Sequence, residues 1–285
     1  MRYARCLTRF TMFLLFFASA FCRAQTTATC DHWTFFISFS ASGINRWKTV
    51  VGTAPQSGGR FTGYIGYANG AVKTYNFPVA TQTHFSKRNA LGVTVGDIDF
   101  SHGLVVTGSS AATVEYPGAM QTILYGINYW DTMVGIFNTG GDFSQPYDGF
   151  KMWKNGSVTT IAYPGAMMTN PMSISDTGVI VGWYVNNGAQ PPFPYHGFVL
   201  ANRVYKALDY PNNNRTLLND INASGVIAGR HINTSAGTQG GFIYVNGTFK
   251  DVTAPNVQVL TLNGINGYGY VTGTSSAGSF TAHCQ

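Results

Sequence analysis

One pattern recurs six times along this 285-residue chain and constrains its fold more than any other feature. Each copy has an Asn or Ser with Gly seven residues later, and five copies also have Pro eleven residues before the Asn or Ser. The copies lie 39 to 47 residues apart, a period typical of β-propellers and solenoids. The first position is occupied by Asn45, Asn89, Asn128, Ser175, Asn222 and Asn266, and the second by Gly52, Gly96, Gly135, Gly182, Gly229 and Gly273.

The fourth copy shows what each unit builds. Two β-rich runs flank Asn155-Gly156, and Asn-Gly between such runs predicts a hairpin turn. Tyr163-Pro164-Gly165 follows, where Pro cannot continue a hydrogen-bonded ladder. Two further β-rich runs then surround the turn at 175–178. Four strands running up and down in each unit predict an all-β protein, a six-bladed β-propeller of four-stranded antiparallel blades.

The two ends of the chain predict how the ring closes. The first unit lacks an opening strand, whereas the chain finishes with a spare one at 279–283. We therefore expect the C-terminal strand to pair into the first blade, which hides exposed sheet edges. The predicted repeat units are 31–56 plus 279–284, 62–100, 102–142, 148–190, 196–236 and 240–277.

The N-terminus has the pattern of a secretory signal. A start containing Arg2, Arg5 and Arg9 precedes an apolar run at 10–21, which is too short to span a membrane. We expect residues 1–24 to be removed by cleavage after Ala24, or alternatively after Ala20, leaving one propeller domain at 25–285. The mature protein would then be secreted or periplasmic, without a membrane span.

Charge and composition limit the classes of partner. Removing the four arginines before residue 25 from the 17 Lys and Arg leaves 13 against 11 Asp and Glu, a net charge of +2. No basic stripe remains, which argues against nucleic-acid binding. Only 10% of residues are charged and 34 are Gly, a composition suited to short strands and tight turns. We expect a monomer.

Two cysteines remain after cleavage, Cys30 and Cys284, at opposite ends of the mature chain. In an oxidising compartment they predict a disulfide that ties the ends together. The alternative is a pair of buried free thiols.

The chain resembles the HAF-type repeat proteins of the bacterial cell exterior. The matching stretches are His196-Gly197-Phe198, the Tyr-Pro-Gly segments, and Ile221-Asn222 with Gly225 and Gly229, together with their counterparts in the other units. The resemblance covers nearly the whole mature chain. It implies secretion and a β-repeat fold, and it implies no particular activity.

The repeated polar residues are best interpreted as structural. Asn before a tight turn bonds its own backbone, and Gly within a strand marks a bulge or a close contact. His102 and His196 occupy the same position in different units, but zinc generally needs three protein ligands and the other units offer no third histidine there. We expect these imidazoles to be hydrogen-bonded across their blades, and we predict neither a metal site nor a cofactor.

The sequence gives little support to catalysis. It contains one Glu, Glu115, and ten Asp, most of them in turns, and it has no nucleophile-elbow motif. No catalytic residues are predicted.

Long, aromatic connections are the best candidates for binding. The segments 136–148 and 183–196 are the longest between a repeated Gly and the next unit, and they share a face with the Tyr-Pro-Gly loops. Aromatic rings beside Asn and Gly suit stacking on sugars, although the same rings could simply cover the ends of the blades. The candidate ligand-binding residues are Phe137, Phe143, Tyr147, Trp183, Tyr184, Phe193 and Tyr195.

These observations favour a secreted, non-enzymatic binding or scaffolding protein whose partner is a glycan or an envelope protein. The alternative is a hydrolase or lyase acting on polysaccharide, with residues from several blades converging on the central channel.

Overall fold

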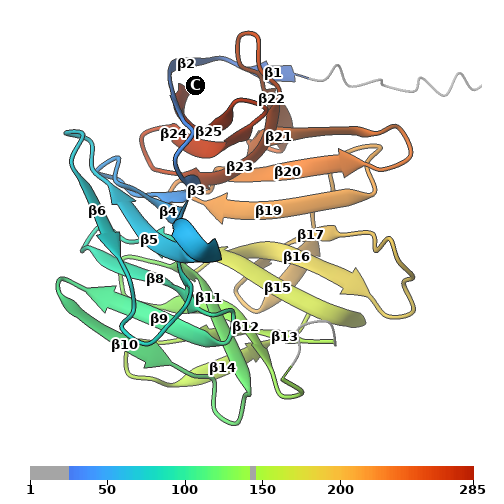
Figure 1. The fold of residues 1–285 in the computed structure, drawn as a ribbon. Coiled ribbons are helices and arrows are strands. Elements are labelled where there is room, and N and C mark those ends of the chain that lie inside the picture. The colour runs from blue at the N-terminus through green and yellow to red at the C-terminus, as the bar shows by residue number, and fades with distance from the viewer. Residues whose placement is uncertain (1–25, 142–145) are drawn as a thin grey trace, which may run out of the picture.

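Six antiparallel β-sheets surround a central axis in the computed structural model, which describes residues 26–141 and 146–285 (Figure 1). The first strand of each sheet contacts the first strands of the two neighbouring sheets and lines the axis. The predicted six-bladed propeller is therefore confirmed. The predicted signal peptide lies outside the described residues.

The first three blades along the chain follow one another without interruption. The first contains β3 (Ser40–Ile44), β4 (Val50–Pro55), β5 (Phe61–Gly66) and β6 (Val72–Tyr75), with a short 3-10 helix, η1 (Ser57–Gly59), between β4 and β5. The second contains β7 (Thr83–Arg88), β8 (Val93–Ile98), β9 (His102–Thr107) and β10 (Ser110–Val114). The third contains β11 (Gln121–Ile127), β12 (Met133–Asn138), β13 (Asp148–Met152) and β14 (Val158–Ile161).

The next two blades repeat this order, and one gains a strand. The fourth contains β15 (Ala166–Ile174), β16 (Ile180–Asn186), β17 (His196–Ala201) and β18 (Val204–Ala207). The fifth contains β19 (Arg215–Ile221), β20 (Ile227–Asn233), β21 (Thr238–Val245) and β22 (Thr248–Val252). A fifth strand, β1 (Thr26–Ala28), runs parallel to β22 at its outer edge.

The sixth blade joins the two ends of the chain. It contains β23 (Val259–Ile265), β24 (Tyr270–Ser275) and β25 (Gly278–Cys284), and β2 (Cys30–Phe36) adds its outermost strand. β2 runs antiparallel to β25, so the predicted closure of the ring by the C-terminal strand is confirmed (Figure 1). Cys30 lies opposite Cys284, and the two form the predicted disulfide with their Cα atoms 4.1 Å apart.

The blade boundaries differ from the predicted repeat units. The unit 148–190, for example, contains β13 and β14 of the third blade and β15 and β16 of the fourth. Each Tyr-Pro-Gly segment connects the outermost strand of one sheet to the innermost strand of the next. The loop after the second strand, in contrast, stays within one sheet because the second and third strands are hydrogen-bonded. The sequence period is correct, but each predicted unit takes half of two neighbouring blades.

The repeated glycines lie in the second strands, opposite β-bulges in the innermost strands. Register shifts occur in all six innermost strands, as between Leu124 and Gly126 in β11. A Cβ atom on Gly135 would lie 2.0 Å from the Ile123 carbonyl oxygen, and the other five repeated glycines are equally crowded. None of the six has a positive φ. The pattern therefore reflects close packing against the bulge, as predicted.

The repeated asparagines form a hydrogen-bonded belt around one end of the axis. The Oδ1 atom of Asn45 accepts from the backbone N–H groups of Trp47 and Thr49, both at 3.0 Å, and fixes the tight turn. Its Nδ2 donates to the carbonyl of Asn89 in the next blade at 3.2 Å. Equivalent links join Asn89 to Asn128, Asn128 to Ser175, Asn222 to Asn266, and Asn266 to Asn45. The belt lacks its sixth link at Ser175, whose hydroxyl accepts from its own turn.

Two substitutions of Asn128 should separate its roles in this belt. Asn128→Ala removes two turn bonds and one link to the next blade, and we expect it to lower the free energy of unfolding by about 2 kcal/mol. Asn128→Ser copies the residue found at position 175, keeps a turn acceptor, and should cost about half as much. Urea denaturation of both variants measures the difference. Equal losses for the two variants would show that the turn bonds contribute nothing and that the link between blades, which both variants lose, accounts for the whole effect.

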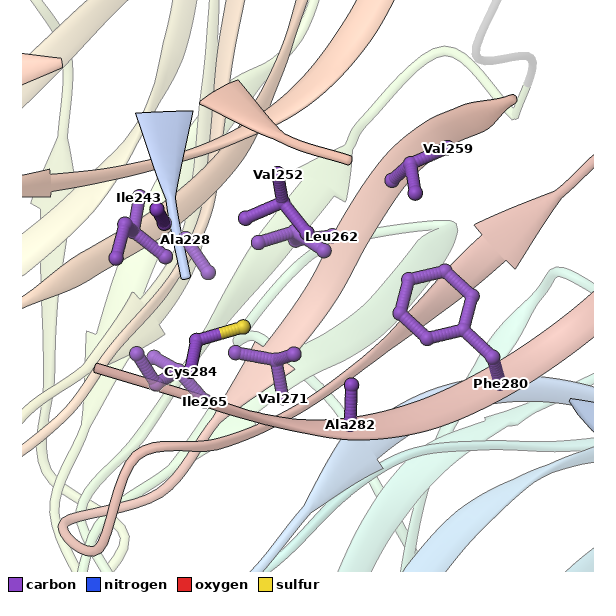
Figure 2. Packing of buried hydrophobic residues seen from close by; sticks show 11 residues of the cluster. Ala228, Ile243, Val252, Val259, Leu262, Ile265, Val271, Phe280, Ala282 and Cys284 are labelled. Carbon is purple, nitrogen blue, oxygen red and sulfur yellow. The ribbon is translucent and has the colours of Figure 1, made fainter. Parts of the chain in front are cut away.

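Apolar side chains fill the space between neighbouring blades. Figure 2 shows the junction of the fifth and sixth blades, where Ala228 and Ile243 face Leu262 and Val271. Phe280 of β25 is fully buried there, and its counterparts Phe150, Phe198 and Phe242 are buried in other blades. The Phe in the third strand is thus a core residue in these four blades and fixes the spacing of the sheets.

Candidate functional site

Bulged residues of the innermost strands line the central channel. Together with Lys87, they surround a cavity of about 260 Å³. The six bulged residues, one from each blade, are Ser42, Ser86, Tyr125, Met172, Asn219 and Asn263.

A buried ion pair crosses this channel. Lys87 of the second blade contacts the carboxylate of Asp220 in the fifth. That carboxylate also accepts from the Ser173 hydroxyl at 2.7 Å and from the backbone N–H groups of Ile221 and Ile265. Every partner is supplied by the protein, so we assign Asp220 to holding the blades together.

A group of aromatic residues lies on the face that bears residues 139–141, residues 146–147 and the loop 187–195, here called the loop face. Trp183 of β16 and Tyr195, just before β17, have ring centroids 4.8 Å apart and are both half-buried. Tyr147 occupies the position before β13 that Tyr195 occupies before β17. The carbonyls of Tyr147 and Tyr195 accept hydrogen bonds from the innermost strands β15 and β19, which hold both residues beside the channel.

Two arginines extend this group. The guanidinium of Arg215 lies over the Tyr195 ring, with Cζ 4.8 Å from the centroid, and its Nε donates to the Phe193 carbonyl at 2.9 Å. Arg230 donates to Gln239, while its buried Nε has no hydrogen-bond partner among the described residues. Neither arginine forms an ion pair with a carboxylate in the described part of the chain.

The electrostatics of this pair favour an anion. Burial, reinforced by the nearby charge of Arg215, lowers the pKa of Arg230. Like charges held close together without a carboxylate between them are stabilised by a bound anion.

Asn170 of β15 joins the aromatic residues to the channel. Its side chain lies beside the phenols of Tyr125 and Tyr147, and its buried Oδ1 has no partner among the described atoms. Burial raises the pKa of Tyr147 to about 12 and also raises that of Tyr125, so both phenols stay protonated at neutral pH. We use the name loop-face cluster for Tyr147, Asn170, Trp183, Tyr195, Arg215 and Arg230.

The remaining predicted site residues are divided between the core and the loops. Tyr184 is only 6% exposed and stacks on Tyr163 with centroids 3.6 Å apart, and Phe137 stacks on Tyr116 at 3.7 Å. These two rings pack between blades rather than on a ligand-binding surface, which corrects the prediction for both. Phe193 is half-buried in the loop beside Arg215, and Phe143 lies outside the described residues.

The histidines at equivalent positions have the predicted structural role. His102 Nδ1 lies 2.7 Å from the Glu115 carboxylate, and His196 Nδ1 lies 2.8 Å from that of Asp209. In both blades the partner is thirteen residues further along the chain, across the hairpin.

Sequence reasoning missed the arginines and Asn170, although a signal was present. Arg230 follows a repeated Gly, as Trp183 does, so the two occupy the same register in neighbouring blades. Aligning the units by this register, rather than searching only the long loops, would have selected Arg230.

A second cavity of about 330 Å³ opens at the other end of the axis, beside the asparagine belt. Arg46, Arg88, Asp176 and Tyr268 contribute to its lining. Asp176 accepts a hydrogen bond from the Tyr129 backbone, and Arg46 donates to the Tyr268 hydroxyl at 3.4 Å. These polar groups mainly connect neighbouring turns.

Comparison with known proteins supports the fold. No protein-family model matches the chain, and no curated protein matches it. Among solved structures, a candidate gluconolactonase covers 92% of this chain and 94% of its own, with a TM-score of 0.57 and 10% identity. A gluconolactonase from Xanthomonas campestris covers 93% and 99%, with a TM-score of 0.56 and 10% identity.

A third structure, an arginine-to-alanine mutant of AofleA from Arthrobotrys oligospora, covers 91% of this chain and 90% of its own, with a TM-score of 0.55 and 10% identity. At this level of identity the likeness concerns the fold alone.

Proposed function

We propose that this protein is a secreted, non-enzymatic binding propeller whose loop-face cluster holds an acidic glycan. The observation that supports this most strongly is the half-buried group formed by Trp183, Tyr195 and the guanidinium of Arg215 over the Tyr195 ring.

Half-buried aromatic rings suit one part of such a ligand. Trp183 and Tyr195 are held by packing and by backbone bonds, so little side-chain entropy is lost when a sugar ring stacks on them. The two rings are tilted by 37° to each other and remain half-buried rather than fully covered.

The arginines suit the acidic part. The Nε–H group of Arg215 donates to a backbone carbonyl, and its two terminal nitrogens point to a further role. A guanidinium group can bind a carboxylate through two nitrogens at once. Asn170 and the phenol of Tyr147 add groups that can bond sugar hydroxyls.

Secretion is supported by the disulfide, because such bonds persist in oxidising compartments. The N-terminal signal pattern and the resemblance to HAF-type repeat proteins agree with this location. The described residues contain no helix with the length and apolar character needed to cross a bilayer. We further propose that the protein acts as a monomer.

The alternative, a polysaccharide hydrolase or lyase, has less support. Such chemistry needs carboxyl groups that face the substrate. Asp220 is surrounded by protein donors, and Asp97 is buried, paired with His84 at 3.0 Å and bonded to the Phe100 N–H.

A glycan array of the untagged mature protein tests the proposal. We expect retention of glycans containing uronic acids, weaker binding of their neutral counterparts, and loss of signal at high salt, because screening weakens arginine–carboxylate attraction. Equal binding of neutral and acidic forms would remove the role given to the arginines. Absence of binding to every glycan, with a captured envelope protein instead, would favour the scaffolding function.

A further inference from the structure

The seam of the ring brings together a second group of polar side chains. Asp31 of β2 lies directly opposite His283 of β25, next to the Cys30–Cys284 disulfide. His32 has a positive φ of 51° at an irregularity in the strand pairing. One carboxylate and two imidazoles, far apart in sequence, therefore meet at one point.

The distances within this group are short. Oδ1 of Asp31 lies 2.7 Å from Nδ1 of His32 and 3.3 Å from Nδ1 of His283. The three candidate ligand atoms all lie within 4.8 Å of one another. No other cluster of three or more such side chains occurs in the described part of the chain.

The hydrogen bond made by Nε2 of His283 indicates which atoms Nδ1 of the same ring can bind. Nε2 lies 3.1 Å from the carbonyl oxygen of Tyr268, and a carbonyl only accepts, so Nε2 must bear the hydrogen. In the neutral imidazole Nδ1 is then a bare lone pair directed at a carboxylate oxygen. A proton on Nδ1 or a metal ion between the two atoms would satisfy both of them. An imidazole that donates its far N–H to a carbonyl is also the usual arrangement of a metal-binding histidine.

The turn that contains Tyr268 and Gly269 packs tightly against the His283 imidazole. Gly269 has a φ of 80°, and a Cβ atom there would lie 2.6 Å from the Cys284 carbonyl and 3.4 Å from Nε2 of His283. The glycine lets the turn bring the Tyr268 carbonyl to the histidine, while Tyr270 packs on the ring at 4.7 Å. His32 is the most exposed of the three side chains, at 73%, against 57% for Asp31 and 22% for His283.

We propose that Asp31, His32 and His283 bind a divalent transition-metal ion, with Zn²⁺ the best match to two imidazoles and one carboxylate. Ligands about 2.0–2.2 Å from a tetrahedral zinc lie roughly 3.3–3.5 Å apart. The distance between Asp31 and His283 already fits this edge, and a small rotation of the exposed His32 provides the third ligand.

The site has two structural consequences. Three protein ligands leave a fourth position open, and His32 also lines a groove of about 420 Å³ that contains Lys48, Tyr64 and Tyr270, so an anionic or water ligand has room to bind. The ion would also join the first described part of the chain to its C-terminal strand, as a second connection beside the disulfide.

Calorimetric titration of the untagged, disulfide-bonded protein with ZnCl₂ at neutral pH tests the proposal. We expect one ion per chain, with affinity weakened at least about tenfold in Asp31→Asn and in His32→Ala. His102→Ala, which removes an exposed histidine paired with Glu115 far from the seam, is the matched control and should bind like the wild type.

Thermal unfolding gives an independent readout. Zn²⁺ should raise the melting temperature of the wild type and of His102→Ala, and should leave that of His32→Ala unchanged, because only binding to the folded state stabilises. The proposal is overturned if the wild type shows no saturable zinc binding, or if Asp31→Asn and His32→Ala bind zinc as tightly as the wild type.

Discussion

Gly182→Ala and Gly229→Ala should each lower the free energy of unfolding by about 3 kcal/mol or more. The added Cβ would lie 2.0 Å from the Asn170 carbonyl oxygen in the first variant and 2.3 Å from that of Leu217 in the second. These oxygens belong to innermost strands at the axis, so moving them disturbs the bulge and the contact with neighbouring blades. The small entropic gain of replacing Gly by Ala cannot offset such a clash.

Gly267→Ala is the matched control for these variants. No atom lies within 4 Å of its added Cβ, and its φ is not positive, so its free energy of unfolding should stay within about 0.5 kcal/mol of the wild type. Guanidinium denaturation of the three proteins measures the effect. Wild-type stability in Gly182→Ala and Gly229→Ala would mean that the six-fold glycine pattern has a cause other than packing.

The double variant Cys30→Ala/Cys284→Ala should lose up to about 5 kcal/mol of stability. The disulfide spans 254 residues, and the chain-entropy model assigns the largest effects to such long loops. It also holds β2 against β25, the antiparallel pair of strands that closes the ring within the sixth blade. Loss of the bond leaves this seam dependent on backbone hydrogen bonds and on the packing of Trp33 against Phe280.

Reduction provides the control for the double variant. Dithiothreitol should lower the denaturation midpoint of the wild type to that of the double variant and should leave the double variant unchanged. A double variant with the wild-type midpoint would show that the seam is already held by the strands alone.

The sequence predicted the architecture because its repeated residues are required by the same backbone turns and close contacts in every blade. The Asn turns and the crowded glycines recur at fixed positions, and each has one structural cause, so they could be counted without coordinates. The blade boundaries could not be found in this way. The order of runs is the same whether a sheet is cut before the Gly-Phe strand or at the Tyr-Pro-Gly segment, and only the hydrogen bonds between β16 and β17 decide.

The candidate site was predicted only in part, for a reason that Trp183 and Tyr184 illustrate. They are adjacent in β16, so their side chains point to opposite faces of the sheet. One faces the loop-face cluster and the other packs on Tyr163, but both are aromatic and the sequence does not say which is which. The pairing of Asp31 with His283 depends on the register of β2 and β25, although the neighbouring cysteines already hinted at it.

The most direct test of the loop-face cluster uses an acidic glycan that binds on the array. Calorimetry measures the affinity of Trp183→Ala and Trp130→Ala for this glycan. Trp183 belongs to the cluster, whereas Trp130 is 64% exposed in an asparagine-belt turn at the other end of the axis. We expect Trp183→Ala to bind about tenfold more weakly or worse, since a lost stacking partner costs on the order of 1.4 kcal/mol, with a nearly unchanged melting temperature. Trp130→Ala should bind like the wild type. Wild-type affinity in Trp183→Ala, or loss of binding in Trp130→Ala alone, would contradict the assignment of the ligand site to the loop face.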